Sequence, residues 1–363
     1  MSQTATENRI DTRNYGIDLL RNVSMFFVVI LHVLGAGGML SAAASMPRKY
    51  EVLKACHIAA MCAVNCYGLI SGYVGYRSKF RLSGIIMLWL QVFLYSAGIG
   101  LILHRTMPEV VTWKKVAELC QPVIYKQYWY FTAYFALYFT MPALNAAIEH
   151  LPRRVLEVSF GVLLVLLTVG QQTFFVNNVF LTGSGYSYLW LAVLYFLGGY
   201  LAKYRKSWNN GLICLLGYVL CVVICWATQY ILRCFGVEKS TRLENYNSPV
   251  MVLQAVFLLL LFANLRLPKW LTKVTAFLAP AAFGVYLIHT HPVVYSHILT
   301  GAYKKLSDYP TWKTVLLMLG VAAGIYVVCM AIDLVRHYLF RALRIKKLLT
   351  KLDNKIFPSE EGR

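Results

Sequence analysis

Stretches of about 20 mainly apolar residues recur along the whole chain, and this is the length at which a helix crosses a bilayer. We place ten such spans, near residues 17–35, 56–76, 82–103, 127–148, 155–171, 186–202, 211–232, 249–265, 274–295 and 313–335. Gln171, Gln172 and the stretch 183–187 blur the ends of the fifth and sixth spans. The pattern predicts an all-α, polytopic membrane helix bundle with both termini on the same side.

The composition agrees with a membrane protein. Hydrophobic residues make up 59% of the 363 residues and charged residues only 14%, and the mean hydropathy is +0.57. A soluble domain with these proportions would expose large apolar patches. Most of the nine cysteines lie in apolar stretches without the spacing of a metal site, so we interpret them as packing residues and expect no metal. Nothing in the sequence resembles a P-loop or a dinucleotide fingerprint.

Basic residues are in large excess, with 35 Lys and Arg against 15 Asp and Glu and a formal net charge of +20. In a soluble chain this excess would suggest nucleic acid binding, but here the cations cluster in alternate short loops, which is typical of cytoplasmic loops. We therefore expect a cytoplasmic segment 1–16, a transmembrane domain 17–335 and a basic cytoplasmic tail 336–363, with no nucleic-acid partner. Residues 341–355 are predicted to form a basic amphipathic helix on anionic membrane lipids.

Asp18, Arg21 and His32 lie in the first span. A charged residue at membrane depth is costly and by default marks a functional site. Eleven residues along an α-helix bring a side chain back to within roughly 20° of its starting face, about 16 Å further on. A neutral imidazole there can take a proton from a hydroxyl nucleophile, although a lone membrane histidine is more often a packed side chain. An Asp18–Arg21 ion pair is the simple explanation of both charges, and it is compatible with an arginine that contacts a phosphate or thioester ligand.

A second cluster follows the second span and contains Ser71, Arg77, Lys79 and Arg81. Two interpretations explain these three cations equally well. One is ordinary positive-inside anchoring, and the other is a docking patch for a polyanionic cofactor such as coenzyme A. The glycines that precede them, at positions 68, 72 and 75, permit close helix packing.

Later spans add isolated polar residues. His289 and His291 are two residues apart and face different directions on a helix, which argues against a metal pair and leaves an interface or acceptor-site role for His289. Asp333 lies one turn before Arg336 and is expected to pair with it. No Asp or Glu is evident that would orient His32 as in a Ser-His-Asp triad.

Other aromatic and histidine side chains have simpler interpretations. Tyr128, Trp129 and Tyr130 open the fourth span, and an interfacial aromatic belt is the default interpretation. His57 and His104 fall at span ends, where they cost little, and we assign them no role.

Taken together, these residues resemble the acyltransferase 3 family of bacterial integral-membrane acyltransferases. The likeness runs in order over most of the chain, and the Arg-x10-His element of the first span is its most specific part. The matching segments are Asp18-Leu-Leu-Arg21-x10-His32, Ile70-Ser71-Gly72-Tyr73 followed by Arg77, Trp129-Tyr130 with Leu137-Tyr138 and Pro142, and Gly284-Val-Tyr-Leu-Ile-His289.

The resemblance implies about ten helices in the bacterial plasma membrane and an acyl-CoA donor, usually acetyl-CoA, presented from the cytoplasm. The implied acceptor is a hydroxyl of a cell-surface carbohydrate or its lipid-linked precursor. His32 is then the catalytic histidine, and Arg21 and Arg77 bind the donor, with Lys79 and Arg81 in the same basic patch. Asp18, Ser71, Trp129 and His289 are expected to support the site.

Several alternatives remain open at this point. An acetyl or a succinyl group, and direct transfer or an acyl-histidine intermediate, are all compatible with the sequence. The sequence also leaves the oligomeric state open. The competing class is a transporter or flippase for a polar or lipid-linked solute, which is often built from an internal repeat. We see no convincing repeat, and the one-sided basic cluster favours a stationary cytoplasmic donor site.

Overall fold

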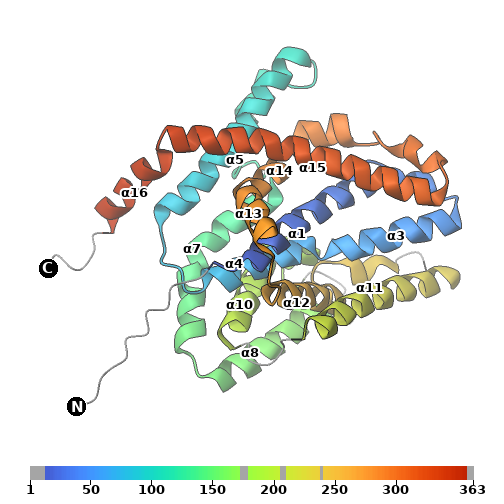
Figure 1. Ribbon diagram of the computed structural model, residues 1–363, viewed down its shortest axis with the longest axis horizontal. Coiled ribbons are helices and arrows are strands. Elements are labelled where there is room, and N and C mark those ends of the chain that lie inside the picture. Colours follow the sequence, from blue (N-terminus) through green and yellow to red (C-terminus); the bar gives the residue numbers. More distant parts are fainter. Residues whose placement is uncertain (1–12, 172–178, 205–209, 238–239, 358–363) are drawn as a thin grey trace.

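The computed structural model describes residues 13–171, 179–204, 210–237 and 240–357, and this described part is helical throughout, without strands (Figure 1). Eight of its helical stretches are long and apolar enough to cross a membrane. They are Tyr15–Leu34 (α1), Pro47–Gly75 (α3, Pro47–Met61, and α4, Ala63–Gly75), Leu82–Thr106 (α5), Trp129–His150 (α7), Gly211–Cys234 (α11), Thr241–Ala263 (ending in α12, Pro249–Ala263), Lys269–His289 (α13, Lys269–Leu278, and α14, Ala282–His289) and Thr311–Ala342 (α15). The shorter helices are α2 (Met39–Ala43), α6 (Trp113–Leu119), α8 (Arg153–Val165), α10 (Tyr188–Tyr204) and α16 (Ile345–Ile356). The prediction of an all-α, multi-pass membrane protein is confirmed.

Two of the ten predicted spans correspond to shorter helices. The span predicted at 155–171 is α8, which has 13 residues and continues as the π-helical turn Leu166–Gly170. The span predicted at 186–202 is α10, which has 17 residues. The count of ten crossings and the placement of both termini in the cytoplasm therefore stay predictions.

Prolines account for two boundaries that differ from the prediction. The second helical stretch begins at Pro47 rather than near residue 56, because a proline fits the first helical position, where no N–H is needed. The ninth span was predicted to reach residue 295, but α14 ends at His289. Pro292 follows three residues later and cannot donate a helical hydrogen bond, so the helix does not continue through it.

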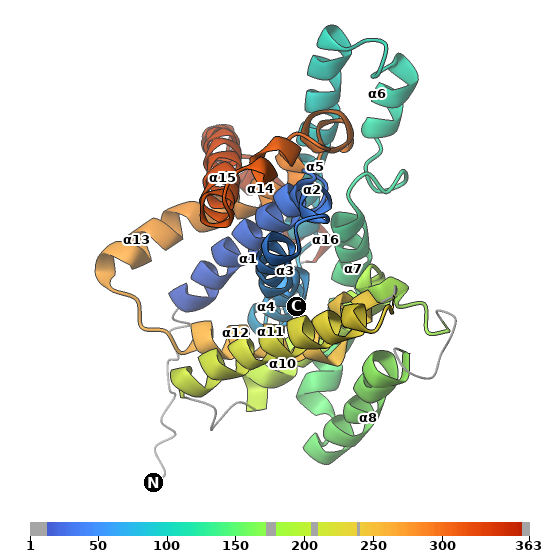
Figure 2. The same ribbon diagram turned by 90° about the vertical axis from the view of Figure 1, so that its right-hand side faces the viewer.

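The helix α1 lies in the middle of the bundle, where it packs against α3, α4, α12, α14 and α15, whereas α5 and α6 extend away from this centre (Figures 1 and 2). It begins where the Asn14 side chain accepts a hydrogen bond from the backbone N–H of Ile17. Val29 and Val33 join one apolar cluster with residues of α14 and α15, and Ile17 joins another with residues of α4 and α10. Because α1 is surrounded, its polar side chains need partners inside the bundle.

The helices α4 and α10 touch through small residues. A Cβ atom added to Gly72 would lie 1.8 Å from the backbone oxygen of Tyr195, and one added to Gly68 would lie 2.7 Å from the Leu194 side chain. Across the interface, a Cβ on Gly198 would lie 2.1 Å from the backbone oxygen of Leu69. The prediction that the glycines of this span permit close packing is confirmed, and α10 is the partner helix.

We predict that Gly72→Ala lowers the melting temperature of the purified protein by several degrees. Overpacking a tight contact costs about 1–3 kcal/mol, and here the obstacle is a backbone oxygen that cannot rotate away. Gly98→Ala is the matched control, because a Cβ at Gly98 in α5 meets nothing within 4 Å. Equal melting temperatures for the two variants in a thermal-shift assay would contradict the packing argument.

A buried carboxylate of α15 forms an ion pair within its own helix and hydrogen bonds to α5. The Asp333 carboxylate accepts hydrogen bonds from Arg336 Nε and Nη2 at 2.9 and 2.6 Å, which confirms the predicted pair. It also accepts from Gln91 Nε2 at 3.0 Å and from the Tyr95 hydroxyl at 2.8 Å, both on α5. A Cβ on Gly284 of α14 would lie 2.1 Å from the Asp333 Cγ, so only glycine leaves room for the carboxylate there. Four donors compensate its charge, as a membrane-depth carboxylate requires.

Candidate active site

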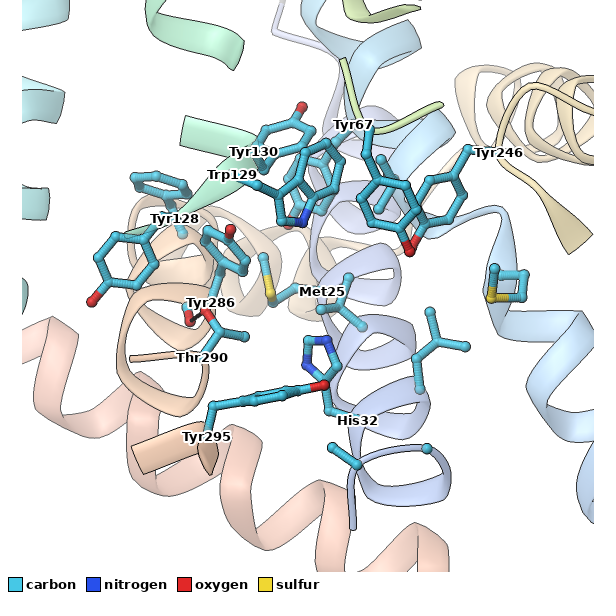
Figure 3. A pocket seen from close by; sticks show the side chains of 18 of the residues that line it. Met25, His32, Tyr67, Tyr128, Trp129, Tyr130, Tyr246, Tyr286, Thr290 and Tyr295 are labelled. Carbon is cyan, nitrogen blue, oxygen red and sulfur yellow. Dashed lines mark hydrogen bonds between the residues drawn. The ribbon is translucent and has the colours of Figure 1, made fainter. Parts of the chain in front are cut away.

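A cavity of about 570 Å³ opens beside the C-terminal half of α1. Met25 and His32 of α1 face Tyr67 of α4, Trp129 of α7 and Tyr286 of α14 across it (Figure 3). The walls are mainly aromatic, and they come from helices that are far apart in the sequence. His32 is therefore one of few ionisable groups on an otherwise aromatic and aliphatic surface.

His32 is hydrogen-bonded to His289. The two nitrogens, His32 Nδ1 and His289 Nε2, lie 2.9 Å apart. The second nitrogen of His289, Nδ1, lies 2.5 Å from the backbone oxygen of Val285 one turn earlier in α14. The structure thus brings together two of the predicted site residues, which are 257 positions apart in the chain.

This chain of hydrogen bonds fixes the tautomer of each neutral imidazole. A carbonyl oxygen only accepts, so His289 Nδ1 carries the proton that it donates to Val285, and His289 Nε2 is the acceptor. His32 then donates from Nδ1 and keeps a lone pair on Nε2. No hydrogen bond to that nitrogen occurs among the described residues. The orienting partner of His32 is therefore another histidine, whereas a Ser-His-Asp triad would use a carboxylate.

A second histidine reaches the same cavity. His57 of α3 lines it, and its Nδ1 lies 3.6 Å from Oε2 of Glu244, which is paired through Oε1 with Lys54 at 2.5 Å. All three side chains are buried or nearly so. Sequence reasoning gave His57 no role, because its position near a span end carries no signal and Glu244 is distant in the sequence. The structure adds His57 to the candidate site.

Arg21 lies one layer away from the cavity. Its Nη1 donates to Asp18 at 2.9 Å, and Asp18 also accepts from Arg13 Nε at 2.5 Å, so the predicted local ion pair is present. The Tyr67 hydroxyl donates to the Arg21 backbone oxygen at 2.8 Å. Arg21 is not among the residues that line the cavity with His32. Both share a face of α1, as predicted, but other side chains separate them.

Three tyrosines lie between Arg21 and the cavity with His32. Tyr67 and Tyr130 line the cavity, their rings are 6.1 Å apart, and Tyr134 follows with its ring 6.3 Å from that of Tyr130. The Tyr67 hydroxyl joins this group to the Arg21 backbone. Ser71 lies beside them and donates to the Tyr67 backbone oxygen at 2.8 Å. We call Tyr67, Tyr130 and Tyr134 the tyrosine layer.

The interpretation of Tyr128–Tyr130 as an interfacial belt is wrong. Tyr128 is 1% exposed and donates from its hydroxyl to the Leu287 backbone oxygen at 3.0 Å. Trp129 lines the cavity, and its ring is stacked with that of Tyr246, with 6.3 Å between the ring centroids. The start of α7 points inward because these rings fill the space around α14, and amphipathic aromatic residues look the same in sequence in either place.

The basic loop after α4 lies at the same end of the bundle as the start of α1. The two helices run antiparallel, since Tyr67 is level with Arg21 and Val64 lines the cavity near His32. Arg77, Lys79 and Arg81 are exposed, and none of them has a carboxylate partner within the described part of the chain. The structure therefore places the predicted residues in three regions. They are the cavity with His32, which we call the imidazole cavity, the tyrosine layer, and the end of the bundle with Arg77, Lys79 and Arg81, which we call the basic end.

The described part of the chain thus combines a helical membrane bundle with a largely aromatic cavity, in which His32 is oriented by His289. A family model described as an acyltransferase domain, that of acyltransferase 3, matches residues 14–334. The chain belongs to this family, as its sequence resemblance indicated, and it is a multi-pass membrane acyltransferase. No curated protein and no solved structure matches the chain.

Proposed function

We propose that the protein transfers an acyl group, most simply acetyl, from a cytoplasmic acyl-CoA to a hydroxyl of a cell-surface carbohydrate or its lipid-linked precursor in the bacterial plasma membrane. The observation that carries the proposal is that His32 lines the cavity while its Nδ1 is bonded to His289, which is itself bonded to Val285, so that Nε2 is left as the basic nitrogen. Such a nitrogen is a general base placed where a hydroxyl can enter.

The donor approaches from the basic end. Arg77, Lys79 and Arg81 offer uncompensated charge to the coenzyme A phosphates, and Arg21 lies deeper, at the tyrosine layer. From Arg21 to His32 the helix rises about 16 Å, which matches a pantetheine arm of roughly 15–20 Å. The arm threads the tyrosine layer and presents the thioester to the cavity.

The acceptor occupies the cavity itself. A volume of about 570 Å³ lies in the range of small-molecule sites, and the faces of Trp129 and Tyr246 suit the C–H faces of a sugar ring. His57, with Glu244 behind it, offers a polar group that can bind a neighbouring hydroxyl. Both substrates then meet at His32.

The transfer balances without a further reactant. His32 Nε2 takes the proton of the acceptor hydroxyl as its oxygen attacks the thioester carbonyl carbon. The C–S bond breaks as the new C–O ester bond forms, and the imidazolium returns its proton to the coenzyme A thiolate. His289 stabilises the imidazolium through the hydrogen bond from His32 Nδ1.

The transporter alternative lacks a comparable observation. Membership of an acyltransferase family favours group transfer, whereas a membrane histidine pair by itself would also suit a proton-coupled transporter. Donor and acceptor approach opposite sides of the tyrosine layer, so transfer needs no alternating access.

We predict that His32→Ala lowers the rate of transfer from acetyl-CoA by about 10²–10⁴-fold, the usual contribution of a general base. The variant should still fold and insert into the membrane, although its melting temperature should fall by a few degrees because buried His289 loses a hydrogen-bond partner. The assay follows radiolabelled acetyl transfer in membranes, with His104→Ala as the control, since His104 lies at the end of α5 outside the cavity. Wild-type transfer by His32→Ala would refute the mechanism.

We predict a graded effect at His289. His289→Leu removes the acceptor of the His32 Nδ1 proton and should lower kcat by about 10–100-fold, because a hydrogen bond to a charged group is worth about 1.5–3 kcal/mol. His289→Gln offers an amide oxygen in its place and should recover part of the loss, with the donor KM unchanged in both. Equal kcat values for Leu and Gln would show that His289 only packs.

A further inference from the structure

A second cavity, of about 880 Å³, lies where α15 turns into α16, with Met87 of α5 at its inner side. We propose that it binds the phosphate headgroup of one anionic membrane phospholipid. It is distinct from the candidate active site, since neither His32 nor Arg21, nor any of Arg77, Lys79 and Arg81, lines it. The proposal does not depend on acyl transfer.

The cavity is built from fixed elements. The α16 residue Asp353 is buried, and its carboxylate accepts from the backbone N–H of Ser83 at 2.9 Å and from the Ser83 hydroxyl, at the first turn of α5. The Phe357 ring meets that of Phe80 at 6.0 Å. α16 therefore folds back onto the start of α5 (Figure 1), which confirms the helix expected over 341–355 in part, because α15 continues to Ala342 before the turn.

The turn itself carries a charged residue in an unusual conformation. Arg344 has φ +52° and ψ +30°, the left-handed region that favours glycine. Its side chain lines the cavity. A non-glycine residue in that region costs of the order of 1 kcal/mol and tends to occur where a side chain has a function.

The cavity concentrates positive charge. Six cations line it and no carboxylate does: Arg336, Arg341, Arg344, Lys346, Lys347 and Lys351. Arg336 is neutralised by Asp333, whereas no ion pair in the described chain includes any of the other five. Like charges gathered in this way repel each other, and a bound anion relieves the repulsion. Arginine and lysine side chains are the groups that bind phosphate oxygens.

The surroundings favour a lipid over a soluble phosphate compound. Met87 and Phe340 give the cavity an apolar side, and the Arg336 guanidinium stacks over the Phe340 ring at 5.2 Å. Leu348 and Leu352, one turn apart on α16, are exposed, as is Leu343 at the end of α15. A phospholipid satisfies both features, because its phosphate meets the cations while its acyl chains cover the apolar side.

The test measures lipid retained by the detergent-purified, full-length protein with native mass spectrometry. Phosphatidylglycerol and phosphatidylcholine are titrated separately. We expect one phosphatidylglycerol to bind the wild type at least tenfold more tightly than phosphatidylcholine. The variant R341A/R344G/K347A should weaken phosphatidylglycerol binding by roughly 100-fold, since each surface cation contributes about a fivefold factor. Glycine at 344 preserves the left-handed turn.

Two further variants sharpen the comparison. R266A/K269A/K273A removes the same charge from exposed positions around α13 and should leave binding unchanged. K347Q/K351Q alters only exposed side chains, so it folds normally and should weaken binding at least tenfold if the triple variant proves unstable.

Three results would overturn the proposal. One is equal retention of the two lipids by the wild type. Another is equal weakening by the α13 variant, which would mean attraction by overall charge alone. The last is displacement of phosphatidylglycerol by millimolar inorganic pyrophosphate or coenzyme A, which would identify a soluble phosphate ligand as the occupant instead of a lipid.

Discussion

The hydrogen bond between His32 and His289 is the interaction on which the rest of the site depends. α1 packs against α2, α3, α4, α12, α13, α14 and α15, so a polar side chain in its C-terminal half needs a partner inside the bundle. α14 supplies that partner, and its own backbone oxygen at Val285 fixes the proton on the far nitrogen. One interaction therefore joins α1 to α14, sets both tautomers and leaves a lone pair facing the cavity.

The second constraint is the separation of charge from the imidazole cavity. Asp18 pairs with both Arg13 and Arg21 near the start of α1, which leaves a net positive charge there, and the tyrosine layer lies between these residues and His32. The layer is made of aromatic rings that carry hydroxyl groups, so it is both apolar and able to form hydrogen bonds. In the proposed function this layer is where a thioester-bearing arm would pass to reach His32.

The sequence predicted the residues better than it predicted their partners. Arg21 and His32 stood out because charged and titratable groups are rare in apolar spans, and the glycines before Arg77 stood out through their spacing. His289 was visible only as a membrane histidine, since 257 residues separate it from His32 and no periodicity links them. His57 was assigned no role for the same reason, because only the fold brings its partner Glu244 next to it. The aromatic start of α7 was misassigned because inward and interfacial tyrosines have the same composition.

The most direct test of the account is acetyl-CoA binding by the purified protein, measured by calorimetry for wild type, Arg21→Ala, Arg77→Ala and the control Lys313→Ala. Lys313 stacks on Tyr309 at the first turn of α15, at the end of that helix away from α16. The account predicts saturable binding that weakens by about tenfold or more in Arg21→Ala, by a few-fold in the more exposed Arg77→Ala, and not at all in the control. Binding that is equal in all four proteins would contradict a donor site at the basic end of the bundle.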